Sequence, residues 1–319
     1  MSITLTDVQS AREVIAGHVV RTPMLPAPRL SELTGASVYV KYENLQVTNS
    51  FKERGARNKL ASLSGVDRGR GVIAMSAGNH AQAVAWAARE AGVDALIVMW
   101  QGADDLKVAA TRGYGAAVDE EADGPTTAFD RLHRLHEETG RTLIHPFDDP
   151  EVIAGQGTVA LEILEDGPVP DVVVVPVGGG GLVSGIATAL KARRSDVRVI
   201  AVEPELSTAL HDGLAAGRSV PVTPKSAADA LSAPFAGESC VRICTQLGVE
   251  SVLVSEDDLA AAFRWLYART KLACELGAAA SAAALLSGKA TVEPGLNVVA
   301  VVSGGNVAPR QAAAILAGR

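Results

Sequence analysis

The chain has 319 residues, of which 48% are hydrophobic and 20% are charged, so it can bury one large core or two ordinary ones. The formal net charge is −7 and the pI is near 5.4, and Lys and Arg form no basic stripe along the sequence, which argues against a nucleic-acid-binding or anionic-membrane-binding protein. The N-terminus has no uninterrupted apolar run and three cysteines are too few for a disulfide framework, so we expect a cytoplasmic protein that acts on a small molecule.

Short apolar runs that are rich in β-branched residues predict strands buried on both faces. They lie at 38–42, 72–75, 95–99, 172–177, 199–202 and 298–302. Ala-rich stretches with helical spacing lie at 81–91, 181–193 and 259–272. This alternation of strand and helix predicts an α/β fold with open parallel sheets, in which ligands bind at the carboxyl ends of the strands.

The first segment of interest is KYENLQVTNSFKERGAR at 41–57, which places Lys52 after a Ser-Phe pair at the expected start of a helix. A lysine in such a place is ordinarily a solvated helix residue. The segment alone therefore indicates no function.

The loop SAGNH at 76–80 follows the strand at 72–75 and precedes an Ala-rich helix. Backbone amides at a helix N-terminus, together with the Ser76 hydroxyl, can hold a carboxylate. Asn79 can offer a hydrogen bond to a ring oxygen. For this segment alone, a plain Ser/Asn helix cap is an equally open interpretation.

Four consecutive glycines, 178–181, follow the strand at 172–177 and precede a helix. Glycine lets successive amides converge on a phosphate at the positive end of a helix. The rival interpretation is a dinucleotide site in a nicotinamide oxidoreductase. GGGGLVSG does not fit G-x-G-x-x-G, because Val183 stands where the third small residue belongs, although Glu203 has the spacing of the acidic residue in that fingerprint.

The segment SGGN follows the strand at 298–302 and begins with Ser303. A hydroxyl at this strand end can pair with a pyridine nitrogen without protonating it, which leaves the ring a weaker electron sink. Such a ring favours elimination of a β-leaving group over transamination.

Taken together, these segments resemble the serine/threonine dehydratase and serine racemase family of pyridoxal phosphate enzymes, which have the tryptophan synthase β-like fold (fold type II). The matching segments, in the family's order, are RTPML, KYENLQVTNSFKERGA, SAGNHAQ, ATRGYGA, HPFDDPEVIAGQGT, VPVGGGGLVSG, AVEPE and VVSGGN. The resemblance implies a large cofactor-binding domain of residues 1–65 and 149–319, a small domain of residues 66–148 that closes over the substrate, and a homodimer.

The resemblance also implies the roles of individual residues. Lys52 would hold pyridoxal 5′-phosphate as a Schiff base and act as the general base that removes the α-proton. The implied cofactor-binding residues are Phe51, Lys52, Asn79, Gly178, Gly179, Gly180, Gly181, Leu182 and Ser303. The implied substrate-binding residues are Ser76, Ala77, Gly78, Asn79 and His80. The implied activity is that of a dehydratase or ammonia-lyase, which converts a β-hydroxy-α-amino acid such as threonine or serine to a 2-keto acid and ammonia.

Departures from the family's pattern leave alternatives open. Ala77 stands where racemases carry a serine as second base, so we expect feeble racemisation. Asn49 replaces a usual glycine, Trp100 a common proline and Ala230 a glycine, while ELGAA at 275–279 replaces Glu-Pro-x-Ala-Gly. These changes are either neutral for packing or signs of a larger or more polar substrate, such as hydroxyaspartate or phenylserine. β-Replacement is disfavoured, because cysteine synthases carry a threonine-rich Ser-Gly-Asn-Thr loop.

Some members of the family hold a divalent cation between a glutamate after the sixth strand and an acid six residues later. Glu203 matches the first position, and Mg²⁺ is the candidate ion. Ala209 occupies the second position and Asp212 is a poor substitute by spacing. We therefore expect an incomplete metal site.

Overall fold

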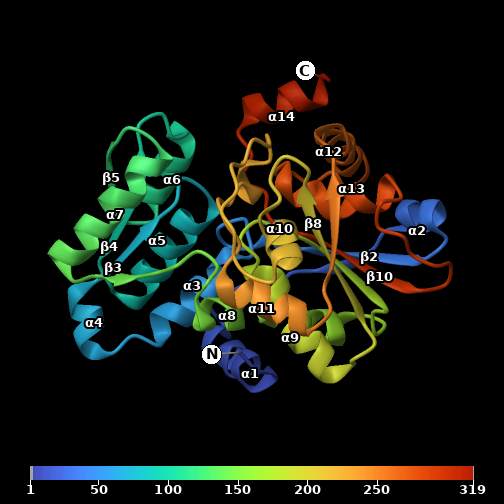
Figure 1. Cartoon of the computed structure of the whole chain (residues 1–319), viewed down its shortest axis with the longest axis horizontal. Helices are drawn as coiled ribbons and strands as arrows, with labels where there is room; N and C mark the ends of the chain where they lie inside the picture. The colour runs from blue at the N-terminus through green and yellow to red at the C-terminus, as the bar shows by residue number, and fades with distance from the viewer. Residues whose placement is uncertain (1–2, 319) are drawn as a thin grey trace.

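The computed structural model describes residues 3–318, and the side chains of all of these except Pro125 and Thr126. This part of the chain folds around two sheets, which lie in the two lobes of Figure 1. The sheet of the larger lobe has the order β1 (Met24–Pro26), β2 (Ser37–Tyr42), β10 (Asn297–Val302), β7 (Val172–Pro176), β8 (Arg198–Pro204) and β9 (Glu250–Val254). The sheet of the smaller lobe has the order β5 (Ala117–Ala122), β4 (Ala95–Trp100), β3 (Val72–Met75) and β6 (Thr142–Leu143).

Within both sheets, neighbouring strands are parallel except for the edge pair of β1 and β2. Parallel strands need covered faces on both sides, and helices cover both sheets. The predicted α/β fold with open parallel sheets is therefore confirmed.

The helices of the larger lobe are α1 (Leu5–Ile15), α2 (Pro28–Thr34), α3 (Lys52–Ala61), α8 (Pro150–Asp166), α9 (Gly181–Arg193), α10 (Ala209–Ala216), α11 (Glu238–Gln246), α12 (Glu256–Thr270), α13 (Ala280–Leu286) and α14 (Pro309–Leu316). Those of the smaller lobe are α4 (Gly65–Arg70), α5 (Asn79–Ala91), α6 (Asp105–Gly113) and α7 (Pro125–Thr139). Single 3₁₀ turns are η1 (Glu43–Leu45), η2 (Asp229–Leu231) and η3 (Gly277–Ala279). Across residues 3–318, none of the helices combines the length and the apolar character that a bilayer crossing needs.

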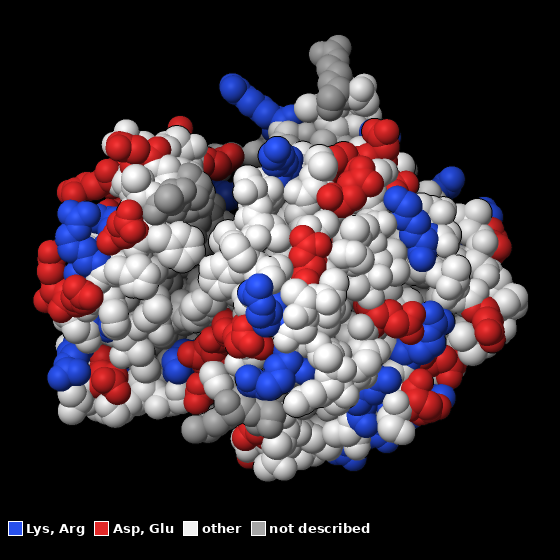
Figure 2. Space-filling view, viewed as in Figure 1, with Lys and Arg blue, Asp and Glu red and all other residues white. Residues whose placement is uncertain are grey.

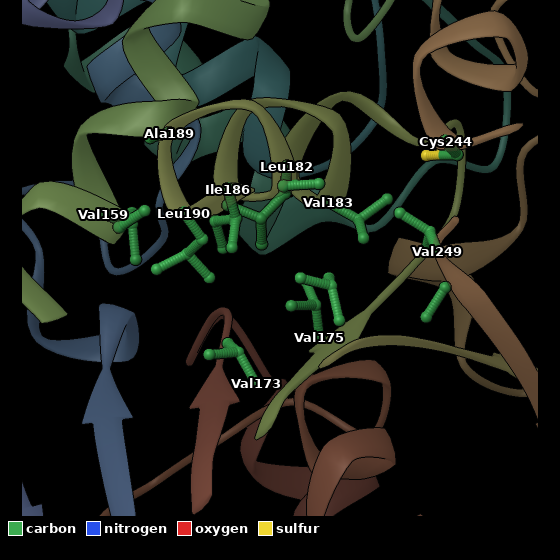
Figure 3. Close-up of a cluster of buried hydrophobic side chains, with 14 of the residues drawn as sticks. Val159, Val173, Val175, Leu182, Val183, Ile186, Ala189, Leu190, Cys244 and Val249 are labelled. Carbon is green, nitrogen blue, oxygen red and sulfur yellow. The ribbon is translucent and has the colours of Figure 1, made fainter. Parts of the chain in front are cut away.

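Strand β7 shows why the sequence carries continuous apolar runs. Successive side chains of a strand point to opposite faces. Val173 and Val175 point toward Leu182 and Ile186 of α9 (Figure 3), while Val174 belongs to the core on the side of α12 and α13. Every residue of β7 is buried, and each buried valine side chain contributes roughly 1.5–3 kcal/mol.

Helix α3 packs in both lobes. Its residues Ala56 and Leu60 belong to the core of the smaller lobe, beside α5. On its other side, α3 crosses α8 where Gly55 meets Gly155, and a β-carbon at Gly155 would lie 2.6 Å from the Arg54 carbonyl oxygen. The two glycines therefore permit a close crossing, which fixes the helix that Lys52 begins.

A buried group of charges supports this crossing. Arg54 is fully buried and donates to Glu43 (2.8 Å) and Glu162 (2.7 Å). Lys41, also fully buried, donates to the same Glu162 at 2.5 Å. Burial alone would lower the pKa of Arg54, but the two carboxylates outweigh it and raise that pKa. Both cations are thus compensated by carboxylates from η1 and α8.

Candidate active site

Lys52 begins α3 beside the end of β10. Two contacts hold the chain there: an isolated bridge between Ser50 and Gly304, and the Phe51 amide, which donates to the Ser303 carbonyl at 3.2 Å. The Lys52 amine donates to the Pro146 carbonyl at 2.7 Å and lies 5.2 Å from the centre of the Phe51 ring. Burial of this amine lowers its pKa to about 8. A larger fraction of it is therefore the neutral nucleophile and base at physiological pH.

A cavity of about 1060 Å³ contains the Lys52 amine and has walls from both lobes. The surface is hollowed between the lobes on the face that Figure 2 shows. All of the candidate cofactor- and substrate-binding residues line the cavity; they are Phe51, Lys52, Ser76, Ala77, Gly78, Asn79, His80, Gly178, Gly179, Gly180, Gly181, Leu182 and Ser303. The structure thus brings together four segments that are far apart in the sequence.

The glycine loop links β7 to α9 at one end of this cavity. A β-carbon at Gly179 would overlap the Phe147 ring, and Gly180 has φ +95° with the Cys240 β-carbon 2.8 Å from where its own would be. Only glycine satisfies both conditions without strain. The first N–H groups of α9 have no acceptor inside the helix. The loop therefore offers a narrow, backbone-lined place for an anion, which fits the phosphate of pyridoxal phosphate.

The loop at 76–80 links β3 to the start of α5. The Ser76 hydroxyl accepts a hydrogen bond from the Gly78 amide at 3.1 Å, which leaves its proton free for a substrate carboxylate. The His80 ring nitrogen Nε2 lies 2.9 Å from the Ile144 carbonyl oxygen. Burial lowers the pKa of His80 to about 3, so its ring is neutral at physiological pH. The His80 side chain fixes the loop against the segment that follows β6 and supplies no positive charge to the cavity.

Two residues that the sequence analysis assigned no role fix the side chain of Asn79. Its amide nitrogen donates to Glu275 Oε1 at 2.7 Å, and its amide oxygen accepts from Asn306 Nδ2 at 2.8 Å. Burial raises the pKa of Glu275 to about 7. One sequence signal could have pointed to Glu275: it is the first residue of ELGAA, the segment that stands where the family has Glu-Pro-x-Ala-Gly.

Ser303 directly follows β10, the neighbour of β7 in the larger sheet, and is 3% exposed. Its carbonyl accepts the Phe51 amide, whereas its hydroxyl has no hydrogen-bond partner among the residues that the structure describes. A hydroxyl that is left unpaired on a cavity wall is available to a bound ligand. Its location on the cavity wall fits the nitrogen of a pyridine ring.

An aromatic wall was also absent from the sequence-based prediction. His145 and Phe147 make an edge-to-face contact with ring centres 4.7 Å apart, and Phe147 and Phe235 make another at 5.5 Å. Burial lowers the pKa of His145 to about 4, and its Nδ1 accepts the Asp148 amide at 2.8 Å. His145 is thus a neutral packing residue next to Lys52. No single sequence motif predicts this wall, because His145 and Phe147 come from one loop and Phe235 from a distant one.

An ion pair joins the lobes at the cavity wall. Lys107 of α6 lies 2.5 Å from Asp229 of η2, and both residues line the cavity. Burial would lower the pKa of Lys107, but the Asp229 carboxylate outweighs it and raises that pKa. The charge of Lys107 is therefore already balanced.

Glu203 does not line the cavity, and its surroundings do not fit Mg²⁺. The carboxylate is fully buried and accepts the amide hydrogens of Leu210 at 2.8 Å and His211 at 2.7 Å. Divalent magnesium needs several oxygen ligands in octahedral arrangement, whereas position 209 offers only a methyl group. Residues 3–318 contain no group of three His, Cys, Asp or Glu side chains that could hold a metal. Both oxygens of Glu203 therefore already accept backbone amides at the start of α10.

Asn49, the amide at a usual glycine position, has φ +59°. This left-handed conformation is one that Asn tolerates better than other non-glycine residues. Its Nδ2 also donates to Asn306 Oδ1 at 3.3 Å. The replacement is thus compatible with the backbone, while Trp100 and Ala230 both line the cavity and bear on its shape.

Comparison with known proteins agrees with this geometry. A family model described as pyridoxal-phosphate dependent enzyme matches residues 15–304. The chain is similar to the L-threonine ammonia-lyase of Thermotoga maritima, with 44% identity over 96% of this chain and 76% of that protein. It is also similar to the catabolic L-threonine dehydratase TdcB of Escherichia coli, with 38% identity over 96% of this chain and 94% of that protein.

Two solved structures have the same fold as this chain over nearly its whole length. A threonine deaminase from T.th. superposes with a TM-score of 0.89 and 40% identity, covering 96% of this chain and 99% of that one. Maize serine racemase superposes with a TM-score of 0.93 and 33% identity, covering 97% of this chain and 95% of that one.

Proposed function

The chain belongs to the pyridoxal-phosphate dependent enzyme family, and from this premise we propose that it is an ammonia-lyase of the threonine/serine dehydratase type. It would convert a β-hydroxy-α-amino acid to a 2-keto acid and ammonia. The observation that carries the proposal is the Lys52 amine, with its lowered pKa, in one cavity with two helix N-termini that suit two anions. The names of the relatives favour threonine as substrate.

The cavity residues fit pyridoxal phosphate, and each would hold one part of it. The amides of 178–182 would bind the phosphate, Phe51 would contact the ring, Asn79 would donate to the ring oxygen and Ser303 would pair with the ring nitrogen. When bound, the cofactor supplies an electron sink that stabilises negative charge on the substrate α-carbon.

Lys52 is the group that moves protons. Its Nζ is held by the Pro146 carbonyl and is desolvated, so it is basic but only partly protonated near pH 8. It would remove the α-proton of the substrate and then supply a proton to the departing β-hydroxyl. The loop at 76–80 would orient the substrate by its carboxylate, and the apolar walls of Phe147 and Phe235 would exclude water from the reacting atoms.

Two side chains restrict the outcome of the reaction. Ser303 is a hydroxyl and not an acid, which favours elimination over transamination. Ala77 carries a methyl group, which moves no proton, so racemisation should be feeble. Replacing Ala77 by Ser should raise racemisation relative to elimination, measured by chiral chromatography of recovered serine; an unchanged ratio would place the second base elsewhere.

We also propose the two-domain division that the family resemblance implies, with a small domain of residues 66–148. All four strands of the smaller sheet fall within these limits, while α3 packs on both sides of the boundary. A cytoplasmic homodimer is the proposed assembly, on the ground of the family resemblance and of three free cysteines. Sedimentation of the purified enzyme tests the dimer.

A second substrate class is favoured by one observation. Met75, Trp100 and Leu132 add apolar side chains from the smaller lobe to the cavity wall. Apolar side chains at the wall would also accommodate a larger apolar β-substituent than the methyl group of threonine, as in phenylserine. Hydroxyaspartate is less favoured, because the nearby cation, Lys107, is already paired with Asp229.

The test is a keto-acid and ammonia assay with threonine, serine, phenylserine and hydroxyaspartate. We expect turnover of at least one of these, and none with Lys52→Ala. Lys225→Ala is the matched control, because Lys225 is exposed and its side chain has no role in the cavity. Turnover retained by Lys52→Ala, or no turnover of any member of the panel by the enzyme loaded with cofactor, would contradict the proposal.

A further inference from the structure

We propose that Glu275 is a positioning residue for the cofactor ring: together with Asn306, it holds the Asn79 amide so that a hydrogen-bond donor, and not an oxygen, faces the cavity. This inference rests on the proposed function, because it concerns the same cofactor site. It goes beyond that function by assigning roles to Glu275 and Asn306, which lie in named segments of the sequence but received no role from the motifs.

Glu275 is built into the wall of the cavity. The residue is 5% exposed, its amide donates to the Gly304 carbonyl at 3.0 Å, and it lines the cavity. A β-carbon at Gly304 would overlap the Glu275 carboxylate. The Glu275 carboxylate therefore fits only because residue 304 is glycine. The segment that carries Ser303, the proposed partner of the ring nitrogen, thus also leaves space for Glu275.

The hydrogen bonds of Asn79 leave one group free. A carboxamide has two N–H donors and one oxygen acceptor. Glu275 Oε1 accepts one N–H at 2.7 Å, and the Asn79 oxygen accepts from Asn306 at 2.8 Å. The second N–H is the only donor left, and Asn79 lines the cavity.

Asn306 is itself fixed in one orientation. Its Nδ2 donates both to Asn79 Oδ1 and to the Thr48 carbonyl, each at 2.8 Å, and its Oδ1 accepts from Asn49 Nδ2 at 3.3 Å. A reversed Asn79 amide would place its oxygen against the Glu275 carboxylate and its nitrogen against the Asn306 nitrogen. Both contacts would be repulsive, so the network permits one orientation of Asn79.

This orientation matters for the chemistry of the ring. A donor toward the ring oxygen stabilises negative charge on that oxygen, whereas an amide oxygen in the same place would repel it. Glu275 and Asn306 would thus determine that Asn79 presents an N–H donor to the ring oxygen and not its amide oxygen. Neither residue needs to touch the cofactor.

The charges around Glu275 come from several elements. Burial raises the pKa of Glu275 to about 7 and the Asp229 carboxylate acts in the same direction, whereas Lys107 and Lys52 lower it. Cys274, the preceding residue, is a buried neutral thiol whose own pKa is raised. The hydrogen bond from Asn79 needs an oxygen acceptor and not a charge, so a glutamine at position 275 can replace the acid.

The experiment uses the whole chain and needs no substrate. Apoenzyme of the wild type and of Glu275→Ala, Glu275→Gln and Asn306→Ala is titrated with pyridoxal phosphate, and the visible circular dichroism of the bound cofactor is recorded. We expect Glu275→Ala and Asn306→Ala to bind about tenfold more weakly, the effect of about one lost hydrogen bond, and to lose at least half of the visible dichroism. Glu275→Gln should stay within about threefold of the wild type and keep the dichroism, because it keeps the acceptor.

The control is Asp257→Ala, an exposed acid in the first turn of α12, and thermal unfolding of each apoenzyme reports the fold. The inference would be overturned if Glu275→Ala or Asn306→Ala bound the cofactor with wild-type affinity and dichroism. It would also be overturned if Glu275→Gln lost as much affinity and dichroism as Glu275→Ala. If Glu275→Ala does not fold, Asn306→Ala and Glu275→Gln still decide between the outcomes. Failure of the proposed function would appear separately, as a wild type that binds the cofactor and turns over no hydroxyamino acid.

Discussion

Lys52 begins helix α3 and carries a desolvated amine. Desolvation of this amine lowers the free energy of unfolding of the protein without cofactor. Its pKa falls from 10.5 to about 8 on folding, so the folded apoprotein holds the Lys52 proton less tightly than the unfolded chain does. Below pH 8 the unfavourable contribution of Lys52 to the stability of the folded apoprotein is fully present. This contribution disappears as the pH rises from 8 to 10.5. Buried functional groups commonly reduce stability in this way.

We therefore expect Lys52→Met to stabilise the apoprotein while abolishing turnover. The gain should be on the order of 1–3 kcal/mol at pH 7, because a shift of one pKa unit corresponds to about 1.4 kcal/mol. It should shrink at pH 9.5. Urea denaturation of both apoproteins at the two pH values measures the difference, and an equal or lower stability of Lys52→Met at pH 7 would contradict the assignment of a desolvated amine.

Asn49 permits a test of the left-handed turn before Lys52. With φ +59°, Asn49→Val should lose about 1–2 kcal/mol, since a β-branched residue is strained in this conformation. Asn49→Gly should differ from the wild type by less than about 0.5 kcal/mol, because the strain is absent and only a long hydrogen bond is lost. Denaturation midpoints decide this, and equal losses in the two variants would show that φ is not the cause.

At the level of residues, the sequence identified groups next to strand ends that the structure brings to one cavity. Lys52, the loop at 76–80, the glycine loop and Ser303 all adjoin a predicted strand or helix, and all of them line the cavity. The roles proposed for Glu275 and Asn306 could not be assigned in this way, although Asn306 lies in the same segment as Ser303. Their role depends on which amide they meet across more than 190 residues of chain, as in the Asn79–Glu275 bond with a sequence separation of 196.

At the level of elements, the crossing of α3 and α8 depends on buried charge. We expect Arg54→Met to destabilise the protein by about 3–5 kcal/mol, because Glu43 and Glu162 would lose their main hydrogen-bonded partner while buried. Arg12→Met is the control, since its pair with Glu165 is about 44% exposed on both sides and exposed pairs contribute about 0–1 kcal/mol. Thermal unfolding of the two variants measures the contrast, and similar small losses in both would mean that the buried charges relax.

The start of α10 gives a second test at this scale. Glu203→Gln should lose about 1–3 kcal/mol, because an amide NH₂ would face the N–H of Leu210 or His211 and leave a buried group unpaired. A chelator should leave the melting temperature of the wild type unchanged, since these amides already use both carboxylate oxygens. Glu205→Gln, at an exposed neighbour, is the control. A chelator-dependent fall in melting temperature would instead establish a cation at Glu203.

The sequence predicted the buried strands and missed the others for a physical reason. The runs at 72–75 and 298–302 lie within β3 and β10 as the structure has them. Strand β5 reads AVDEEA and is only partly buried at one end of its sheet, so it lacks a continuous apolar run. Strand β6 has two residues, too few for any pattern.

For the molecule as a whole, the cofactor should bind the two lobes together. The proposed contacts come from α3, α5, α9 and the segment after β10, which belong to both lobes. We expect added pyridoxal phosphate at 100 times its dissociation constant to stabilise the wild-type apoprotein by about 2.7 kcal/mol. Thermal unfolding with and without cofactor measures this, and the gain should fall sharply in Lys52→Ala. Equal gains in the two proteins would show that binding does not involve Lys52.

Helix α3 limits which segments of this enzyme can be exchanged for those of a relative. Ala56 and Leu60 complete the core of the smaller lobe from a helix that precedes residue 66, and Gly55 is matched to Gly155 in α8. A chimera that takes residues 66–148 from a relative would therefore combine a foreign sheet with the native α3. The side chains of α3 and the foreign α5 would then not pack well against each other. A transplant that includes α3 would move the mismatch to α8 and carry Lys52 with it. Lys52, the proposed catalytic residue, thus lies on a helix that neither parent of such a chimera could contribute without disturbing a core.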